Sequence, residues 1–415
     1  MKKILSIMLA LCVFTVPLLL VSAQTDVETL RGSTLTVYNW GEYISDGSDG
    51  SLNVNKEFET RYGIKVVYDT FENNEVMYSK IKGGGVNYDV LIPSDYMIER
   101  MISEKMLQKL DFANIPNDKY IDSKYKGLPY DPQDEYSVPY SVGMIGLIYN
   151  TKKVLDAPTS WTALWDKRYK KEILMINNPR DAFAIAHAVL GISYNTTVDA
   201  DWKAGAEKLK EQKAFVQSYV NDEVFNKMES GESALAPYYA GDFLTMQENN
   251  PDLAFVYPSE GVNAFVDAMC IPTSAQNKAA AELYINFMQS PEIALANAEY
   301  IYYASPNTAV LANEDYSLKD NEVIYPDNAS TLKTEIFSNL PPATLKLMSS
   351  LWDEVKTYEG KAITEENVEE DNSATESKTG LSSNTKTIIG LGAFVGVAAI
   401  YLIYRTVQKK KRENV

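Results

Sequence analysis

The sequence predicts an α/β protein of two lobes with a membrane helix near its C-terminus. The chain has 415 residues, of which 45% are hydrophobic, so it can bury a large core, and its length favours two lobes over one. From Thr34 onward, short β-rich runs alternate with runs of helical periodicity. A long uncharged run near the C-terminus is followed by a cluster of basic residues.

The first elements are expected to be strand, helix, strand, helix and strand. Apolar and β-branched runs predict strands, and an apolar residue at every third or fourth position predicts helices. These patterns predict a strand over residues 34–38, a helix carrying Val54, Phe58 and Tyr62, a strand over 64–68, a helix capped by Asn74, and a buried strand over 88–92.

The middle and the end of the body continue the α/β pattern. Residues 128–140 are rich in proline and tyrosine, and we expect the first crossing between lobes there. The later elements are expected to be a strand over 144–149, a helical anchor at Trp161 and Trp165, a strand over 173–176, a helix opened by Asn178 and Pro179, a helix over 277–288 and an amphipathic helix around 345–355. His187 lies among apolar residues and is expected to be a core residue.

The stretch from Gly261 to Pro272 carries the most suggestive pattern. Read as a strand, it places Phe265 and Asp267 on one face, because side chains alternate between faces. A carboxylate is costly to bury without a partner, and an aromatic ring beside it suits an ammonium group. The alternative is a carboxylate at a strand end, capped by backbone N–H groups.

Both ends of the chain indicate export and tethering. Residues 1–23 have the basic, apolar and small-residue regions of a signal peptide, with an uncleaved signal anchor as the alternative. Residues 387–404 are expected to form a single transmembrane helix, with a buried soluble helix as the alternative, and 405–415 a basic cytoplasmic tail. Residues 359–386 are polar and are expected to form a flexible stalk.

Charge and composition exclude several classes of function. The chain has 39 basic and 56 acidic residues, which argues against a nucleic-acid partner and is compatible with a cationic ligand. One histidine and, after cleavage, one cysteine exclude a multi-Cys/His zinc site, and no cofactor is expected. With one histidine on an apolar helix, Ser-His-Asp or Cys-His catalysis has no place. A carboxylate-based hydrolase is the remaining enzyme alternative.

Aromatic and acidic residues follow several of the expected strands. In open α/β sheets, ligands bind beyond the carboxyl ends of the strands, so these side chains are candidates for one binding site. They are Trp40, Glu42 and Tyr43 after the first strand, Ser94, Asp95 and Tyr96 after the third, Asn178 and Asp181 after the strand at 173–176, and Tyr238 and Tyr239 after a later one.

Six segments, in order, resemble the spermidine/putrescine-binding proteins of polyamine ABC importers. They lie at residues 38–43, 63–66, 88–94, 137–140, 178–181 and 265–272, and the likeness runs from about residue 34 to 358. The resemblance implies a periplasmic-binding-protein-like fold of type II with hinge crossings, a polyamine ligand and ABC permease partners. The implied lobes are 34–141 with 269–315, and 142–268 with 316–358.

The resemblance also implies which residues bind. Trp40, Tyr43, Ser94 and Tyr96 would contribute from the first lobe, and Asn178, Asp181, Tyr239, Phe265, Asp267 and Tyr303 from the second lobe and the hinge side. Asp267 would hold one terminal amine of the ligand, with aromatic walls around its methylenes.

This chain departs from the family pattern at several of these positions. The family has two acids where Asn178 and Asp181 stand, tryptophans where Tyr239 and Phe265 stand, and a glutamine where Phe337 stands. One carboxylate is missing and another is shorter, which leaves open whether putrescine or spermidine is preferred. Asp181 could also serve only to cap its helix.

We therefore expect a non-enzymatic polyamine-binding subunit of an importer, exported and tethered to the outer face of the cell membrane. The rivals are a membrane-anchored sensor and a binding protein for another small cationic or sugar-like solute. An amino-acid ligand would need an arginine for its carboxylate, and Arg180 is the candidate near the site.

Overall fold

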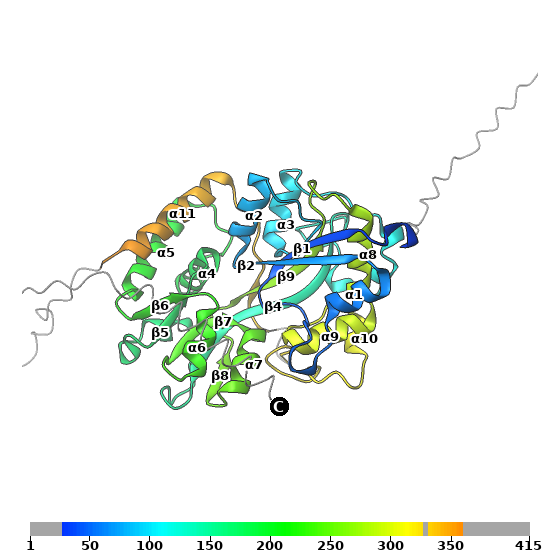
Figure 1. Ribbon diagram of the computed structural model, residues 1–415. Coiled ribbons are helices and arrows are strands. Elements are labelled where there is room, and N and C mark those ends of the chain that lie inside the picture. Colours follow the sequence, from blue (N-terminus) through cyan, green and yellow to red (C-terminus); the bar gives the residue numbers. More distant parts are fainter. Residues whose placement is uncertain (1–26, 327–330, 360–415) are drawn as a thin grey trace, which may run out of the picture. The chain divides into compact units, whose positions relative to one another are not determined.

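A ten-stranded mixed sheet runs through the described part of the chain, residues 27–326 and 331–359, in the computed structural model (Figure 1). The strand order is β2-β1-β3-β9-β4-β7-β5-β6, with β10 beside β9 and β8 beside β4. The strands are β1 Thr34–Trp40, β2 Lys65–Phe71, β3 Val90–Leu91, β4 Ser137–Asn150, β5 Ile173–Ile176, β6 Val216–Val220, β7 Leu235–Tyr239, β8 Leu253–Val256, β9 Val262–Cys270 and β10 Thr334–Glu335.

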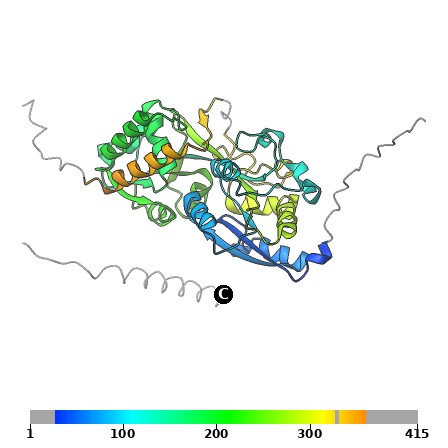
Figure 2. The same cartoon turned by 90° about the horizontal axis from the view of Figure 1, so that it is seen from above.

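Helices pack around both ends of this sheet (Figures 1 and 2). They are α1 Val54–Tyr62, α2 Asn74–Gly83, α3 Asp95–Ser103, α4 Pro179–Leu190, α5 Asp199–Gln212, α6 Glu223–Glu229, α7 Ala240–Asn249, α8 Lys278–Met288, α9 Pro291–Ile301, α10 Thr308–Leu311 and α11 Pro342–Thr357. The α11 helix, coloured orange, packs along α5, so the end of the described chain lies on the β5–β6 side.

Two long strands join the two halves of the sheet. In the first half β1 pairs in parallel with β2 and β3, and in the second half β5 pairs in parallel with β6 and β7. The 14-residue β4 pairs antiparallel with β9 over its first part and with β7 and β8 over its second. Because parallel strands end at the same edge, the loops after β1 and β3, and those after β5, β6 and β7, gather in two groups.

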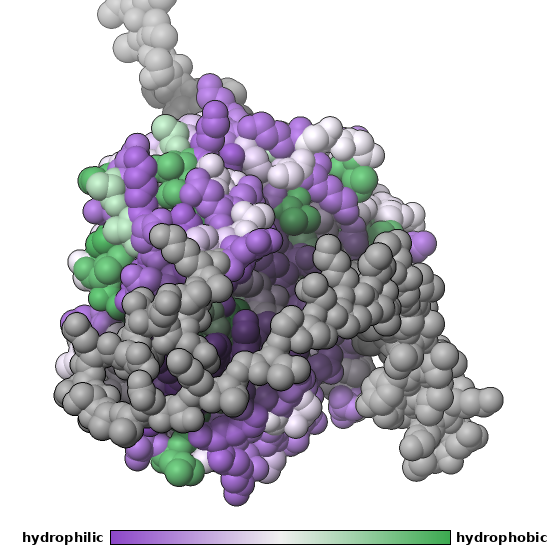
Figure 3. All heavy atoms as spheres, turned by 90° about the vertical axis from the view of Figure 1, so that its left-hand side faces the viewer, coloured by the Kyte–Doolittle hydropathy of each residue, from purple (hydrophilic) through white to green (hydrophobic). Residues whose placement is uncertain are grey.

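Two hydrophobic clusters form the interior, a smaller one in the first half and a larger one that spans both halves. Phe58 of α1 packs edge-on against Tyr284 and Phe287 of α8, beside β1 and β2. In the second half, Phe183 of α4 packs against Trp202 of α5. His187 lies fully buried against Trp202, as the sequence predicts. The outer surface in Figure 3 is mainly hydrophilic, with separate small apolar patches, which is ordinary for a solvated protein.

The expected strands and helices are found, with three corrections. The α2 helix is capped by Asn73 and not by Asn74, because Asn73 is extended and its side chain accepts from the backbone N–H of Val76. The strand expected over 88–92 pairs only at Val90–Leu91. Trp161 and Trp165 lie at the two ends of a short 3₁₀ helix, which Ser160 caps, and not on an α-helix.

Several predictions fall outside the described residues. The predicted leader, membrane helix and basic tail lie there, as does the stalk beyond Glu359. Within residues 27–326 and 331–359, no helix is both long and apolar enough to cross a membrane. The division into lobes at the expected boundaries stays a prediction.

Candidate ligand-binding site

A cavity of about 100 Å³ lies where strands from both halves of the sheet end. Of the candidates chosen because they follow strands, Tyr238 lines it but Glu42 and Asp95 do not; Asp95 is buried and accepts from the backbone N–H of Val266 instead. The structure does bring together all ten residues that the resemblance implies; that they bind a ligand stays a prediction. They are Trp40, Tyr43, Ser94, Tyr96, Asn178, Asp181, Tyr239, Phe265, Asp267 and Tyr303. Eleven more residues complete the wall: Gly41, Phe71, Glu72, Asn74, Ile176, Asn221, Asp222, Tyr238, Asp242, Asn263 and Phe337.

The cavity wall is acidic and aromatic. Five carboxylates and nine aromatic rings line it, and among the lining residues that the structure describes there is no lysine, arginine or histidine. Asp181 and Asp267 are buried and Asp242 is half-buried, whereas Glu72 and Asp222 are exposed. Desolvated carboxylates without a cation are electrostatically unfavourable, so this wall attracts positive charge.

Asp267 lies in the middle of β9, opposite Ser141 of β4, and only 3% of its surface is exposed. The Tyr43 hydroxyl donates to its Oδ2 atom over 2.8 Å, while Oδ1 has no hydrogen-bond partner within the described residues. Burial raises the pKa of Asp267 to about 6, although the Ser94 and Tyr43 hydroxyls lower it. Its side chain is therefore held by hydroxyl groups, not by the backbone cap that the alternative reading required.

Asp181 lies in the first turn of α4 and repeats this arrangement. The Tyr239 hydroxyl donates to its Oδ2 atom over 2.8 Å, and its buried Oδ1 has no partner in the described part of the chain. Burial raises its pKa to about 6. The helix is capped instead by Asn178, which accepts from the backbone N–H of Arg180. Asp181 is thus left with one oxygen free toward the cavity.

Aromatic rings stand around these carboxylates. Tyr239 and Phe265 meet edge-on with ring centroids 5.6 Å apart, and Tyr303 meets Tyr43 edge-on at 5.2 Å. Gly241 allows the Tyr303 ring this position, because a Cβ atom there would lie 2.3 Å from the ring.

Three acidic residues of the wall were not selected from the sequence: Glu72, Asp222 and Asp242. Burial raises the pKa of Asp242 to about 7, and the neighbouring Asp222 raises it further, while the Tyr303 hydroxyl lowers it. A signal for all three exists, since Glu72 follows β2 directly, Asp222 follows β6 by two residues and Asp242 follows β7 by three. All three obey the rule that ligand residues follow strands.

Two residues near the site differ from what the sequence suggested. Phe337 lines the cavity and meets the Tyr96 ring edge-on at 5.8 Å, a position to which the resemblance assigned no role in this chain. Arg180 is 2% exposed and does not line the cavity. An amino-acid carboxylate would therefore find no arginine in this wall.

Comparison with known proteins agrees with this geometry. Residues 87–331 match the family model described as bacterial extracellular solute-binding protein. A spermidine/putrescine-binding periplasmic protein of Salmonella typhimurium is 34% identical over 73% of this chain and 86% of its own. A crystal structure described as a putative spermidine/putrescine ABC transporter from Listeria monocytogenes is 37% identical, with a TM-score of 0.74, over 79% of this chain and 99% of its own.

A further solved structure shows the same relationship. The spermidine/putrescine ABC transporter substrate-binding protein of Streptococcus pneumoniae is 33% identical, with a TM-score of 0.66, and 79% of this chain covers 99% of that protein. The chain therefore belongs to the spermidine/putrescine-binding proteins among the bacterial extracellular solute-binding proteins, a family of non-enzymatic transport components with an α/β periplasmic-binding-protein fold.

Proposed function

We propose that this protein captures a polyamine, spermidine or putrescine, outside the cell and delivers it to the permease of an ABC importer. The observation that carries the proposal is the cavity wall of five carboxylates and nine aromatic rings without a basic side chain. A polyamine offers what this wall lacks, namely ammonium groups separated by short apolar chains.

The expected energetics favour such a ligand. Each ammonium group gains about 0.5–2 kcal/mol from a cation–π contact, and each buried methylene contributes roughly 0.8 kcal/mol. In this proposal one ammonium lies against Asp267 and Tyr43, and another against Asp181 and Tyr239. A further positive charge on the ligand would lie against Asp242, next to Tyr303.

Two broader features belong to the same proposal. The halves of the sheet act as two lobes, 34–141 with 269–315 and 142–268 with 316–358, which close on the ligand around β4 and β9. Residues 359–386 serve as a stalk, and 387–404 as a membrane anchor that keeps the lobes near the permease.

Calorimetric titration of the full chain with putrescine, spermidine and spermine tests the ligand class. Lysine and maltose serve as controls, because lysine adds a carboxylate and maltose removes the charge. We expect micromolar or tighter binding of at least one polyamine, about −8 kcal/mol, and none of either control. Absence of heat with every amine, or equal binding of lysine, would refute the proposal.

A further inference from the structure

Arg180, directly before Asp181 on α4, is a buried cation outside the cavity wall. Its Nη2 atom donates to Asn195 Oδ1 over 3.1 Å and to the Ser338 carbonyl oxygen over 3.3 Å. Its Nε and Nη1 atoms are buried and have no hydrogen-bond partner within the described residues. Two unsatisfied donors on a buried guanidinium are costly unless an acceptor reaches them in another state of the protein.

A carboxylate that could accept from these donors, Glu75, lies in the other half of the protein. Glu75, in the first turn of α2, accepts from the Tyr96 hydroxyl through Oε1 over 3.0 Å. Its Oε2 atom is buried and likewise unpartnered in the described part of the chain. Burial raises the pKa of Glu75, while the Tyr96 hydroxyl and the charge of Arg180 lower it.

Tyr96 stands between these two charges. The guanidinium carbon of Arg180 lies 5.6 Å from the centroid of the Tyr96 ring and 4.3 Å from that of Phe337, and both rings line the ligand cavity. The segment that carries Phe337 also spans the halves, since the backbone N–H of Asn339 donates to Glu99 of α3 over 2.7 Å. The two residues with unpartnered atoms therefore contact the same ring, Tyr96, from different halves of the protein.

We propose that Glu75 and Arg180 form a charge pair across the two halves, which latches them together behind Tyr96 when the cavity closes. This inference rests on the proposed function only for the identity of the ligand that closes the cavity. The pair itself is formed between two side chains of the protein. Neither residue lines the cavity, so both are positioning residues: they hold Tyr96 and Asp181 in place without touching the ligand. Pairing satisfies the free oxygen of Glu75 and a free donor of Arg180 at once.

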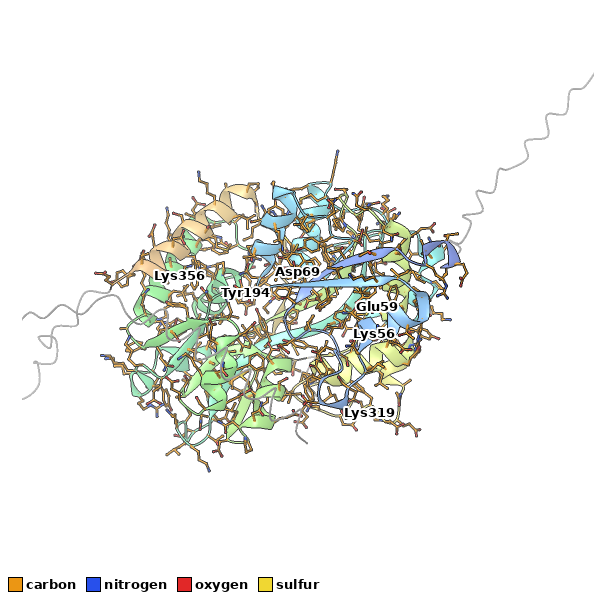
Figure 4. All side chains as sticks on the ribbon, viewed as in Figure 1. Lys56, Glu59, Asp69, Tyr194, Lys319 and Lys356 are labelled. Carbon is orange, nitrogen blue, oxygen red and sulfur yellow. The ribbon has the colours of Figure 1, made fainter. Side chains whose placement is uncertain are left out.

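The distance between the halves is the direct test. Spin labels on Lys56→Cys in α1 and Lys356→Cys in α11 report it, because these two residues lie on opposite halves (Figure 4). Distance distributions from pulsed electron resonance are recorded for the full chain with and without polyamine. They are compared among the labelled parent, Glu75→Gln and Arg180→Gln. If Arg180→Gln fails to fold, Arg180→Lys takes its place, because it keeps the buried charge but removes the two unpartnered guanidinium donors.

A matched control removes an acid from an exposed ion pair. Glu172→Gln loses the 2.8 Å contact to Lys153 on the surface of the second half and should leave the distances unchanged. Protein without the two introduced cysteines corrects for any labelling of the buried Cys270.

We expect the compact separation to be depleted by Glu75→Gln and by Arg180→Gln, and polyamine affinity to fall about tenfold in each. The Glu75→Gln/Arg180→Gln double variant should lose no more affinity than either single one, because both break the same pair. Unchanged distance distributions in both single variants, or losses that multiply in the double variant, would overturn the latch. Altered distances in the variants, with no response of the parent to polyamine, would uphold the latch and refute the proposed ligand.

Discussion

Replacing Asp267 by asparagine is expected to abolish tight polyamine binding while leaving the fold intact. The carboxylate is 3% exposed, and its Oδ1 atom has no partner among the described residues, so an incoming ammonium group is its natural counter-charge. Asparagine keeps the shape and can still accept from the Tyr43 hydroxyl, but it removes the negative charge.

The size of the effect follows from the burial of the pair. Removing one partner of a buried ion pair costs about 3–5 kcal/mol, because the other charge is left desolvated. This corresponds to a rise in Kd of roughly 10²-fold to several thousandfold. The ligand-free protein should respond in the opposite sense. A folded-state pKa of about 6, above the ordinary value of 3.8, means that Asp267 lowers stability progressively as the pH rises from about 3.8 to about 6, and that this loss is complete above pH 6. At pH 7 the variant should therefore be as stable as the parent or more so.

Titration calorimetry with putrescine and spermidine, with thermal unfolding of the ligand-free protein beside it, measures both effects. Asp252→Asn is the matched control, because it makes the same chemical change at an exposed residue paired with Lys152. Retained micromolar binding by Asp267→Asn would refute the role assigned to this carboxylate. Loss of binding with an equal loss of Tm would show a damaged fold instead.

Three further predictions concern pH and packing. Polyamine affinity should fall by about tenfold for each of Asp181 and Asp267 between pH 7 and pH 5, because both must ionise from a pKa of about 6 to pair with an ammonium group; pH-independent calorimetric Kd values would contradict this. Gly241→Ala should weaken binding and also lower stability by about 1–3 kcal/mol, since its Cβ would lie 2.3 Å from the buried Tyr303 ring and push it toward the cavity; titration and denaturant unfolding together check it. Gly205→Ala should lower stability by about 1–3 kcal/mol in denaturant unfolding and leave Kd unchanged, because its Cβ would lie 2.8 Å from the buried histidine ring.

The sequence alone predicted most of the elements and about half of the residues that line the site. Hydrophobic periodicity and capping residues predicted α1, β1, β5 and the start of α4, because these elements depend on patterns among residues close together in the sequence. The ten residues that the resemblance implied all line one cavity, whereas the rule that ligand residues follow strands also selected Glu42 and Asp95, which do not line it.

The tertiary structure decided how those residues are paired. That Tyr43 donates to Asp267 and Tyr239 to Asp181 depends on contacts between segments 224 and 58 residues apart, which no local pattern encodes. The same holds for Asp242, whose place in the wall depends on the packing of α7 against the sheet, and for Arg180. From the sequence Arg180 was a possible ligand residue, yet the fold turns it behind the wall toward Tyr96 and Phe337. The burial of these side chains and their pairing arise only when distant segments of the chain pack together. Composition and spacing therefore identified the acidic and aromatic residues, while tertiary packing decided which of them pair.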